Sequence, residues 1–169
     1  MKISLIAAVA DNRVIGGPDG GIPWDLPWDA EHFRSYTQNK WILLGRKTYS
    51  EMEGWFTTQH PVVLTSRETL SLYDPSHRIA SSVEEAIQLC REQEADELVV
   101  CGGASVYEAA LPQVEKMILT RVHCSPEGKA FFPDYEASGN WETVHREFHS
   151  HGSQNTHDAD LEILVRKSV

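Results

Sequence analysis

The segment Ile22-Pro23-Trp24-Asp25-Leu26-Pro27-Trp28-Asp29-Ala30-Glu31-His32-Phe33 decides how this chain is interpreted. Its two prolines predict an extended or turn conformation, because proline disfavours the helical region for the residue before it. A helical pattern then begins near Trp28, in which Asp29, Phe33 and Thr37 recur every four residues and share one face. Asp29 is the only acid on this otherwise apolar face.

Two interpretations of Asp29 fit this pattern. A carboxylate among apolar side chains is costly unless a positively polarised group pairs with it, so Asp29 is a candidate site for a flat, cationic or donor-rich ligand. Alternatively, Asp29 is a solvated acid in the first helical turn, where the helix dipole favours negative charge. Spacing alone favours the second interpretation, and the rest of the chain favours the first.

Length and composition predict one domain, over residues 1–169, of which 41% are hydrophobic. No apolar run is long enough to cross a membrane, and the first ten residues lack the charged leader and cleavage site of a signal peptide. Three widely spaced cysteines argue against a disulfide framework and predict a cytoplasmic location. The net charge of −10 argues against nucleic-acid and membrane partners. An anionic ligand would therefore need local basic groups.

Strand-like and helix-like runs alternate along the chain. Val, Ile, Leu and aromatic residues predict strands near 2–10, 40–45, 61–65, 77–80, 97–102, 115–122, 141–149 and 160–167. Apolar periodicity predicts helices near 28–38, 47–53, 83–93 and 104–110, the third after a capping box at Ser82. We expect a largely parallel α/β sheet, with the last two strands forming an antiparallel hairpin at its edge.

Two strand–glycine–helix junctions predict a phosphate-binding site. Gly45 follows the buried run 41–44 and precedes Arg46 and Lys47, while Gly102 and Gly103 follow the run 97–101. Such junctions point free backbone N–H groups at a ligand, and glycine permits close approach of the backbone. One junction alone is more typical of an ordinary turn than of a phosphate site. Two junctions together with the strand end 65–67 favour a dinucleotide, although the G-x-G-x-x-G fingerprint of the usual Rossmann arrangement is absent.

The order and spacing of several motifs closely resemble the dihydrofolate reductase family. The motifs are Ile3–Ala10, Asn12–Gly16, the segment 22–33, Gly45-Arg46-Lys47-Thr48, Cys101-Gly102-Gly103-Ala104-Ser105-Val106-Tyr107, Glu127-Gly128 and Phe132-Pro133-Asp134-Tyr135. The likeness runs from Met1 to about Arg166. It implies a single catalytic domain with an eight-stranded mixed sheet and four flanking helices. The implied reaction is NADPH-dependent reduction of 7,8-dihydrofolate to 5,6,7,8-tetrahydrofolate.

The resemblance also implies a cofactor site. Residues matching the family's motif would surround the 2′-phosphate (Arg46, Lys47, Ser66, Arg67), pass the pyrophosphate (Gly102, Gly103, Ala104) and lie by the nicotinamide and its linkage (Ala7, Ala8, Ile15, Thr48). The remaining cofactor candidates are Gly16, Ile22, Gly45, Thr65, Ser105 and Val106. Arginine and hydroxyl groups around a phosphate favour NADPH over NADH.

The same resemblance implies a pterin site with Asp29, Trp24 and Thr120 as its catalytic residues. Asp29 would accept two hydrogen bonds from the pterin's amino group and adjacent ring nitrogen, and the Thr120 hydroxyl would support that contact. The proton would reach the imine through water, which Trp24 would help to order. The remaining substrate candidates are Ile6, Ala7, Ala30, Phe33, Arg34, Met52, Phe56, Cys101 and Tyr107.

The chain departs from the family's pattern at several positions. Gln59 or its neighbour His60 stands where an arginine usually clamps the glutamate tail, so we expect weak binding of that tail, with Arg34 as a partial substitute. Ala30 replaces a larger aliphatic residue, and antifolate sensitivity therefore does not carry over. The glycine-rich segment 16–22 is expected to be a closing lid. Lys129 stands where an acid commonly contacts that lid.

Two alternatives to dihydrofolate reduction remain at this point. The first is a reductase of the same fold acting on another heterocycle, such as the riboflavin-pathway pyrimidine reductases, and the second is a catalytically silent pterin- or dinucleotide-binding module.

The late hairpin is rich in histidine and aspartate, but these residues lack a compact ligand spacing, so we expect a solvated hairpin and no metal: His145, His149, His151, His157, Asp158 and Asp160. The family's usual monomer is the expected oligomeric state.

Overall fold

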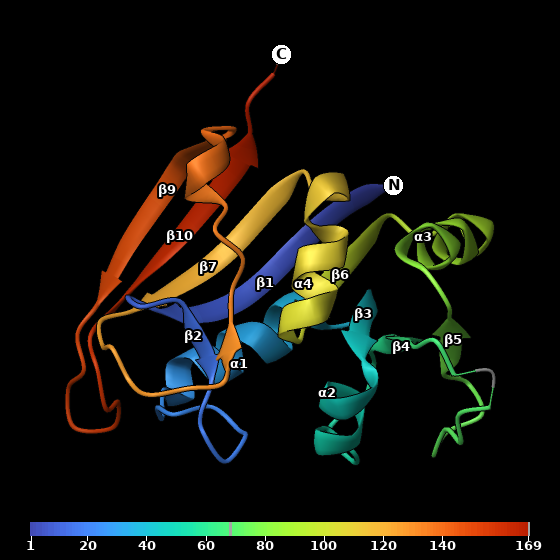
Figure 1. Cartoon of the computed structure of the whole chain (residues 1–169), viewed down its shortest axis with the longest axis horizontal. Helices are drawn as coiled ribbons and strands as arrows, with labels where there is room; N and C mark the ends of the chain where they lie inside the picture. Colours follow the sequence, from blue (N-terminus) through green and yellow to red (C-terminus); the bar gives the residue numbers. More distant parts are fainter. Residues whose placement is uncertain (68, 169) are drawn as a thin grey trace.

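One eight-stranded sheet forms the centre of the computed structural model, which describes residues 1–67 and 69–168 (Figure 1). Its strands lie in the order β5-β4-β3-β6-β1-β7-β10-β9, and β2 pairs separately with β8. The strands are β1 (Lys2–Ala10), β2 (Val14–Gly16), β3 (Trp41–Gly45), β4 (His60–Leu64), β5 (Arg78–Ala80), β6 (Glu97–Gly102), β7 (Lys116–Val122), β8 (Ala130–Phe131), β9 (Trp141–His149) and β10 (Ala159–Arg166).

The helices connect these strands as crossovers. They are α1 (Pro27–Thr37), α2 (Arg46–Glu51), α3 (Val83–Glu92) and α4 (Ala104–Ala110), with short 3₁₀ turns η1 (Leu111–Gln113) and η2 (Glu136–Ser138). Half of the capping box predicted at the start of α3 forms, since Ser82 Oγ accepts a hydrogen bond of 3.0 Å from the backbone N–H of Glu85. The Glu85 carboxylate accepts the backbone N–H of Ser81, at 2.7 Å, instead of that of Ser82.

The predicted elements are confirmed, with small differences at their ends. β10 pairs antiparallel with both β7 and β9, as the edge hairpin requires, while the pairs among β5, β4, β3, β6, β1 and β7 are parallel. The prediction of a helix to residue 53 is wrong, because α2 ends at Glu51 and the chain turns through Gly54, whose φ is +81°. The short strands β2 and β8 were not predicted.

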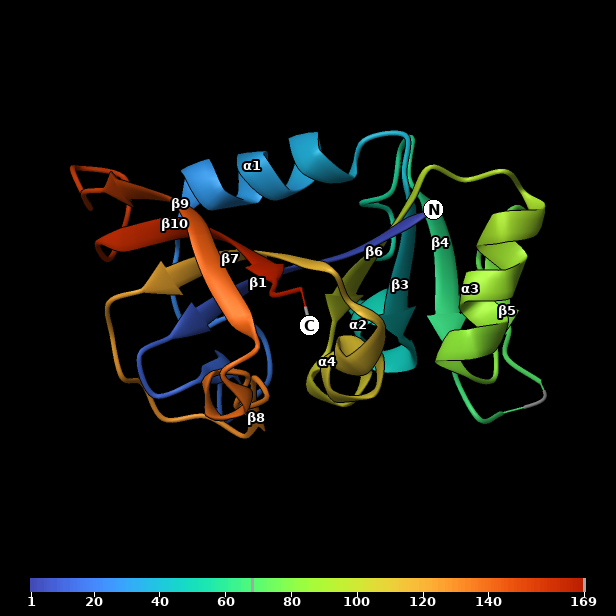
Figure 2. The same cartoon turned by 90° about the horizontal axis from the view of Figure 1, so that it is seen from above.

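Helices cover both faces of the sheet (Figure 2). On one face, α3 and α4 bury Ala86, Cys90 and Ala110 against the sheet. On the other face, Tyr49 of α2 joins a second buried cluster, and Phe33 and Tyr36 of α1 pack against it. Alternate residues of β1 contribute to the two clusters, as expected for a strand buried on both sides.

The sheet splits at one place, between β1 and β6. These strands pair in parallel only as far as Leu5 and Val100, whereas β1 continues to pair with β7 as far as Ala10 and Val122. Beyond the split, Ile6 and Ala7 of β1 and Cys101 of β6 border an opening at the carboxyl ends of parallel strands. Ligands of open α/β sheets bind at such a place.

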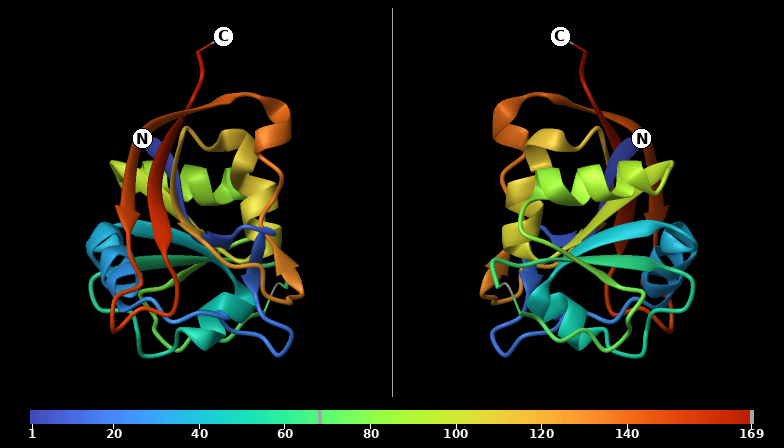
Figure 3. Two further views of the ribbon diagram at one scale, coloured as in Figure 1. Left: turned by 90° about the vertical axis from the view of Figure 1, so that its left-hand side faces the viewer. Right: turned by 90° about the vertical axis from the view of Figure 1, so that its right-hand side faces the viewer.

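Two loops approach the start of α1 from distant parts of the chain. Thr156, in the loop between β9 and β10, accepts a hydrogen bond from the Asp25 backbone N–H at 3.0 Å and donates its own N–H to the Asp25 carbonyl at 3.0 Å. Figure 3 shows this loop beside α1. The loop before β8 contacts the base of the segment 16–22, where the Lys129 N–H donates to the Gly16 carbonyl at 3.1 Å.

Gly128 should be sensitive to the addition of a single methyl group. A Cβ at this position would lie 2.4 Å from both the Gly16 carbonyl oxygen and Val14 Cγ1, closer than packed atoms tolerate. We expect Gly128→Ala to lower the free energy of unfolding by about 1–3 kcal/mol, measured by denaturant titration. Gly17→Ala, whose Cβ would meet nothing closer than 3.5 Å, is the matched control. Equal stability of the two variants would contradict this packing.

Candidate active site

A single large cavity occupies the split between β1 and β6 and continues along the carboxyl edge of the sheet. Its volume of about 1580 Å³ exceeds the roughly 300–1,000 Å³ of a pocket for one small molecule, so it has room for two ligands side by side. Most predicted site residues line it: Ile6, Ala7, Ala8, Ile15, Gly16, Ile22, Trp24, Asp29, Ala30, Phe33, Gly45, Arg46, Lys47, Thr48, Met52, Thr65, Ser66, Cys101, Gly102, Gly103, Ala104, Ser105, Val106 and Tyr107.

The carboxylate of Asp29 lies in the first turn of α1 and is joined to the sheet by Thr120 of β7, whose hydroxyl donates a hydrogen bond of 2.5 Å to Asp29 Oδ1. Thr120 itself is buried and does not line the cavity; it contributes by holding Asp29. Burial raises the pKa of the Asp29 carboxyl, and the Thr120 hydrogen bond opposes that rise. The Thr120 hydroxyl uses one lone pair of Oδ1, which leaves Oδ2 and the other lone pair of Oδ1 for a ligand's donors.

Tyr107 of α4 closes the point where the two strands separate. Its hydroxyl donates a hydrogen bond of 2.8 Å to the Ile6 carbonyl, the first residue of β1 beyond the pairing with β6. Gly102 makes room for the ring, because a Cβ there would lie 3.1 Å from three of its atoms. Burial raises the pKa of Tyr107 well above its ordinary value, so the hydroxyl remains a neutral donor.

The two predicted strand–glycine–helix junctions lie against each other. A Cβ on Gly45 would come within 3.9 Å of the Gly102 carbonyl and the Gly103 nitrogen, and 3.2 Å from Val106. A Cβ on Gly103 would lie 3.4 Å from Thr48 Oγ1. The junctions therefore form one glycine-lined cradle with Arg46 and Lys47 at its edge, as a dinucleotide phosphate would require.

The cradle extends to the ends of β4 and β5. Thr65 and Ser66 line the cavity there, opposite Ser81 and Ser82 before α3. Thr65 Oγ1 accepts the Arg67 backbone N–H at 3.2 Å, which fixes the turn after β4. Hydroxyls beside basic residues suit a phosphate group.

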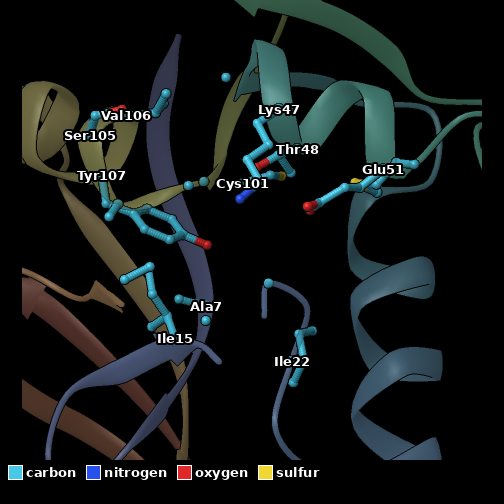
Figure 4. Close-up of a pocket in the computed structure, with 18 of the residues that line it drawn as sticks. Ala7, Ile15, Ile22, Lys47, Thr48, Glu51, Cys101, Ser105, Val106 and Tyr107 are labelled. Carbon is cyan, nitrogen blue, oxygen red and sulfur yellow. The ribbon is translucent and has the colours of Figure 1, made fainter. Parts of the chain in front are cut away.

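The glycine-rich segment 16–22 forms another wall of the cavity. The Gly17 N–H donates to the Gly21 carbonyl at 2.8 Å, which closes a compact loop. Gly20 rests against α2, since a Cβ on it would lie 3.9 Å from Lys47 Nζ and 4.0 Å from a Glu51 carboxylate oxygen. Figure 4 shows Ile22 of this loop across the cavity from Tyr107. Ile22 is 65% exposed, so an apolar side chain of the loop is available to cover a ligand.

Three predicted residues do not line the cavity, besides Thr120. The Arg34 guanidinium lies over the Trp55 ring, 4.4 Å from its centroid. Phe56 packs among Tyr49, Trp55 and His77. Arg67 is exposed beyond the turn at Thr65. Arg34 and Phe56 contact Trp55, which lines the cavity, and so are connected to the site only indirectly.

The side chains at positions 59 and 60, where the family usually has a clamping arginine, are both engaged within the protein. Gln59 is buried, and its amide oxygen accepts the backbone N–H groups of Thr57 at 3.0 Å and Thr58 at 3.2 Å. Its amide nitrogen donates to Thr37 Oγ1 at 3.3 Å. The His60 ring faces Trp41 instead of the cavity. Neither side chain presents a charge to a bound ligand.

Several cavity residues were missed by the sequence analysis: Glu51, Trp55, Leu64, Ser81, Ser82, Glu84 and Ala130. The sequence pattern could have indicated Glu51, because this residue follows Lys47 by one helical turn and so shares its face. The serines belong to a capping box whose location at the cavity depends on the pairing of β4 with β5. Trp55 follows the unpredicted turn at Gly54.

The expected histidine-rich hairpin carries no compact metal site. Among residues 1–67 and 69–168, no group of three or more His, Cys, Asp and Glu side chains is arranged to hold a metal ion. His151 and Asp158 pair locally in the loop, at 2.7 Å. Within the same described ranges, no helix has the length and apolar character needed to cross a membrane.

Comparison with known proteins identifies the family. The family model for dihydrofolate reductase matches residues 2–166. The chain belongs to the dihydrofolate reductase family. It is 32% identical to dihydrofolate reductase type 3 of Salmonella typhimurium, over 99% of each chain, and 34% identical to dihydrofolate reductase of Staphylococcus haemolyticus, over 98% of this chain and 96% of the relative.

A solved dihydrofolate reductase from Enterococcus faecalis, complexed with NADP(H) and RAB-propyl, superimposes with a TM-score of 0.86. It is 28% identical and covers 99% of this chain and 97% of its own. The dihydrofolate reductase fold expected from the sequence is thereby confirmed. The glycine cradle at Gly45, Gly102 and Gly103 and the adjoining basic residues fit the dinucleotide of this family.

The basic edge of the cradle predicts a preference for the phosphorylated cofactor. We expect NADPH to bind at least about tenfold more tightly than NADH, because Arg46 and Lys47 can pair with the additional phosphate. Isothermal titration should show that Arg46→Leu narrows this difference, whereas Arg91→Leu, on the distant last turn of α3, leaves it unchanged. Binding or turnover with NADH equal to that with NADPH would contradict the assignment.

Proposed function

We propose that this chain reduces 7,8-dihydrofolate to 5,6,7,8-tetrahydrofolate with NADPH, and that Asp29 is the residue that binds and polarises the pterin. The observation that carries the proposal is a half-buried carboxylate, held by Thr120, at the wall of a two-ligand cavity that the glycine cradle also lines. Membership of the dihydrofolate reductase family along nearly the full chain supports the same activity.

Asp29 orients the pterin ring. Its carboxylate accepts hydrogen bonds from the amino group and the adjacent ring nitrogen of the pterin, and such a bidentate pair fixes the plane and direction of the ring. The Thr120 hydroxyl donates a hydrogen bond to one of the two oxygens and so restricts rotation of the Asp29 carboxylate. Negative charge at this edge of the ring raises the basicity of the imine on the other side, which favours its protonation.

When bound, NADPH supplies the hydride, and the protein supplies alignment and exclusion of water. Ala7 and Tyr107 line the cavity where β1 and β6 part, and so border the place where the two ligands would meet (Figure 4). Trp24 is only 9% exposed, lines the cavity near Asp29, and shields the water through which the proton arrives. Ile22 and the loop 16–21 cover the ligands.

Asp29→Asn should keep the fold and lose most turnover at neutral pH. Asparagine cannot carry the negative charge that raises imine basicity, so the rate should fall by roughly 100-fold and recover partly in acid, where the imine is protonated directly from solution. Steady-state rates between acid and neutral pH measure this. Asp25→Asn removes an acid at the cavity rim whose loop contacts involve only its backbone, and should behave like the wild type. Wild-type rates for Asp29→Asn would remove Asp29 from the mechanism.

We also propose that the glutamate tail of folate is bound weakly. Gln59 has both ends of its amide engaged within the protein, and Arg34 rests on Trp55 instead of facing the ligand. A neutral amide cannot replace the charge-assisted pair that arginine makes with a carboxylate.

Gln59→Arg should therefore lower the Michaelis constant for dihydrofolate by roughly tenfold. The gain should be absent with a dihydropterin that lacks the glutamate, because the pterin contacts are unchanged. His60→Arg places the same charge on the neighbouring exposed position beside Trp41 and serves as the control. An unchanged Michaelis constant in a folded Gln59→Arg protein would count against weak tail binding.

The family assignment supports the reductase over the two alternatives, another heterocycle or a silent module. We further propose that residues 1–169 act as one catalytic domain, as a monomer, in the cytoplasm. The three cysteines are all free, which suits a reducing compartment. Sedimentation of the purified protein tests the monomer.

A further inference from the structure

The side of α1 that faces away from the cavity meets the edge hairpin through an aromatic pair. The rings of Trp28 on α1 and His149 at the end of β9 are stacked, with centroids 3.9 Å apart and planes inclined by 11°. Figure 2 shows the first turn of α1 beside the end of the β9–β10 hairpin. Because Asp29 directly follows Trp28, this contact places an imidazole beside the helical turn that carries Asp29.

His149 has a carboxylate partner of its own. Its Nε2 lies 2.9 Å from Glu147 Oε1, two residues earlier on the same face of β9. The other oxygen of Glu147 lies 3.5 Å from Nε2 of His145, whose side chain is 51% exposed. When protonated, the His149 ring is thus held between an indole and a carboxylate, with 28% of its side chain open to solvent.

A second imidazole approaches Asp29 from its own helix. His32 follows Asp29 by three residues, so the two side chains lie on adjacent positions of the same face. His32 is half-buried, and in the part of the chain that the structure describes its buried Nε2 has no hydrogen-bond partner. A buried polar nitrogen without a partner is unfavourable, which suggests a role other than stability.

We propose that His149 and His32 are positioning residues that act through Asp29: the stack on Trp28 holds one imidazole beside the first turn of α1, the helical spacing holds the other, and together they keep Asp29 in the form that binds the pterin. The inference rests on the proposed function of Asp29, but it concerns a property of the carboxyl group that can be measured without turnover.

The electrostatic balance at Asp29 has identifiable contributors on every side. Burial raises the pKa of the carboxyl, whereas the hydrogen bond from Thr120 on β7 and the charges of His32 and His149 lower it. From α4, Tyr107 faces Asp29 as a neutral phenol. From β9, Glu147 and His145 act on His149.

The sign of the effect follows from these contributors. A protonated imidazole near a carboxylate stabilises the ionised form and lowers the proton affinity of the carboxyl. Loss of either imidazole should therefore move the titration of Asp29 to higher pH. In mildly acidic solution, less Asp29 would be ionised and pterin binding would weaken, while activity well above this pH range would be retained.

Carbon-13 NMR titration of the Asp29 side-chain carboxyl in ligand-free protein tests the proposal directly. We expect the midpoint to rise by roughly half a pH unit in His149→Phe, which keeps an aromatic ring on Trp28, and also in His32→Phe. The matched control is His151→Phe, which removes an exposed imidazole from the same hairpin that pairs with Asp158 and not with Glu147, and should leave the midpoint unchanged. Unchanged midpoints in both test variants would overturn the proposal; if His149→Phe does not fold, His32→Phe decides.

The pH dependence of kcat/KM for dihydrofolate provides the second readout. The acidic limb should shift to higher pH in both variants, while kcat on the plateau stays within about twofold of the wild type. A purely structural role would instead lower activity at every pH without moving the limb. If the NMR midpoint shifts but the wild type does not reduce dihydrofolate, the proposed function fails and the tuning of Asp29 by the two histidines stands.

Discussion

The separation of β1 from β6 beyond Leu5 and Val100 is the constraint on which the rest of the structure depends. Parallel strands that part leave backbone groups without partners, and these must be satisfied or given to a ligand. Tyr107 takes one of them, the Ile6 carbonyl, and Gly102 makes the approach of its ring possible. The resulting opening lies where the carboxyl ends of parallel strands and their glycine junctions converge. A cavity for two ligands follows from that geometry.

The helix α1 brings the carboxylate to this opening, and contacts on both sides determine its chemistry. Thr120 ties Asp29 to β7 through Oδ1, and both carboxylate oxygens keep lone pairs for the donors of a ligand. Trp28 ties the same turn to His149 at the sheet edge. The energetic cost of partly burying this carboxylate is offset in part by the Thr120 hydroxyl, and a ligand with hydrogen-bond donors would offset more of it.

Local patterns predicted most of the fold, and resemblance predicted most of the cavity. The eight main strands and four helices follow from apolar runs and periodicity, whereas β2 and β8, of three and two residues, are too short for either signal. The Asp29 face was visible in the spacing, but its Thr120 partner is 91 residues away and depends on the pairing of β7 with β1. Trp55 and the inward-turned Gln59 amide depend on tertiary packing, which sequence periodicity does not encode.

The most direct test of the account is NADPH oxidation by the purified protein with dihydrofolate, followed as the fall in near-ultraviolet absorbance. The account predicts rapid oxidation that requires both compounds and forms tetrahydrofolate. If the folded protein binds NADPH but does not oxidise it with dihydrofolate, the central claim is contradicted, and another heterocycle or a binding role would have to replace it.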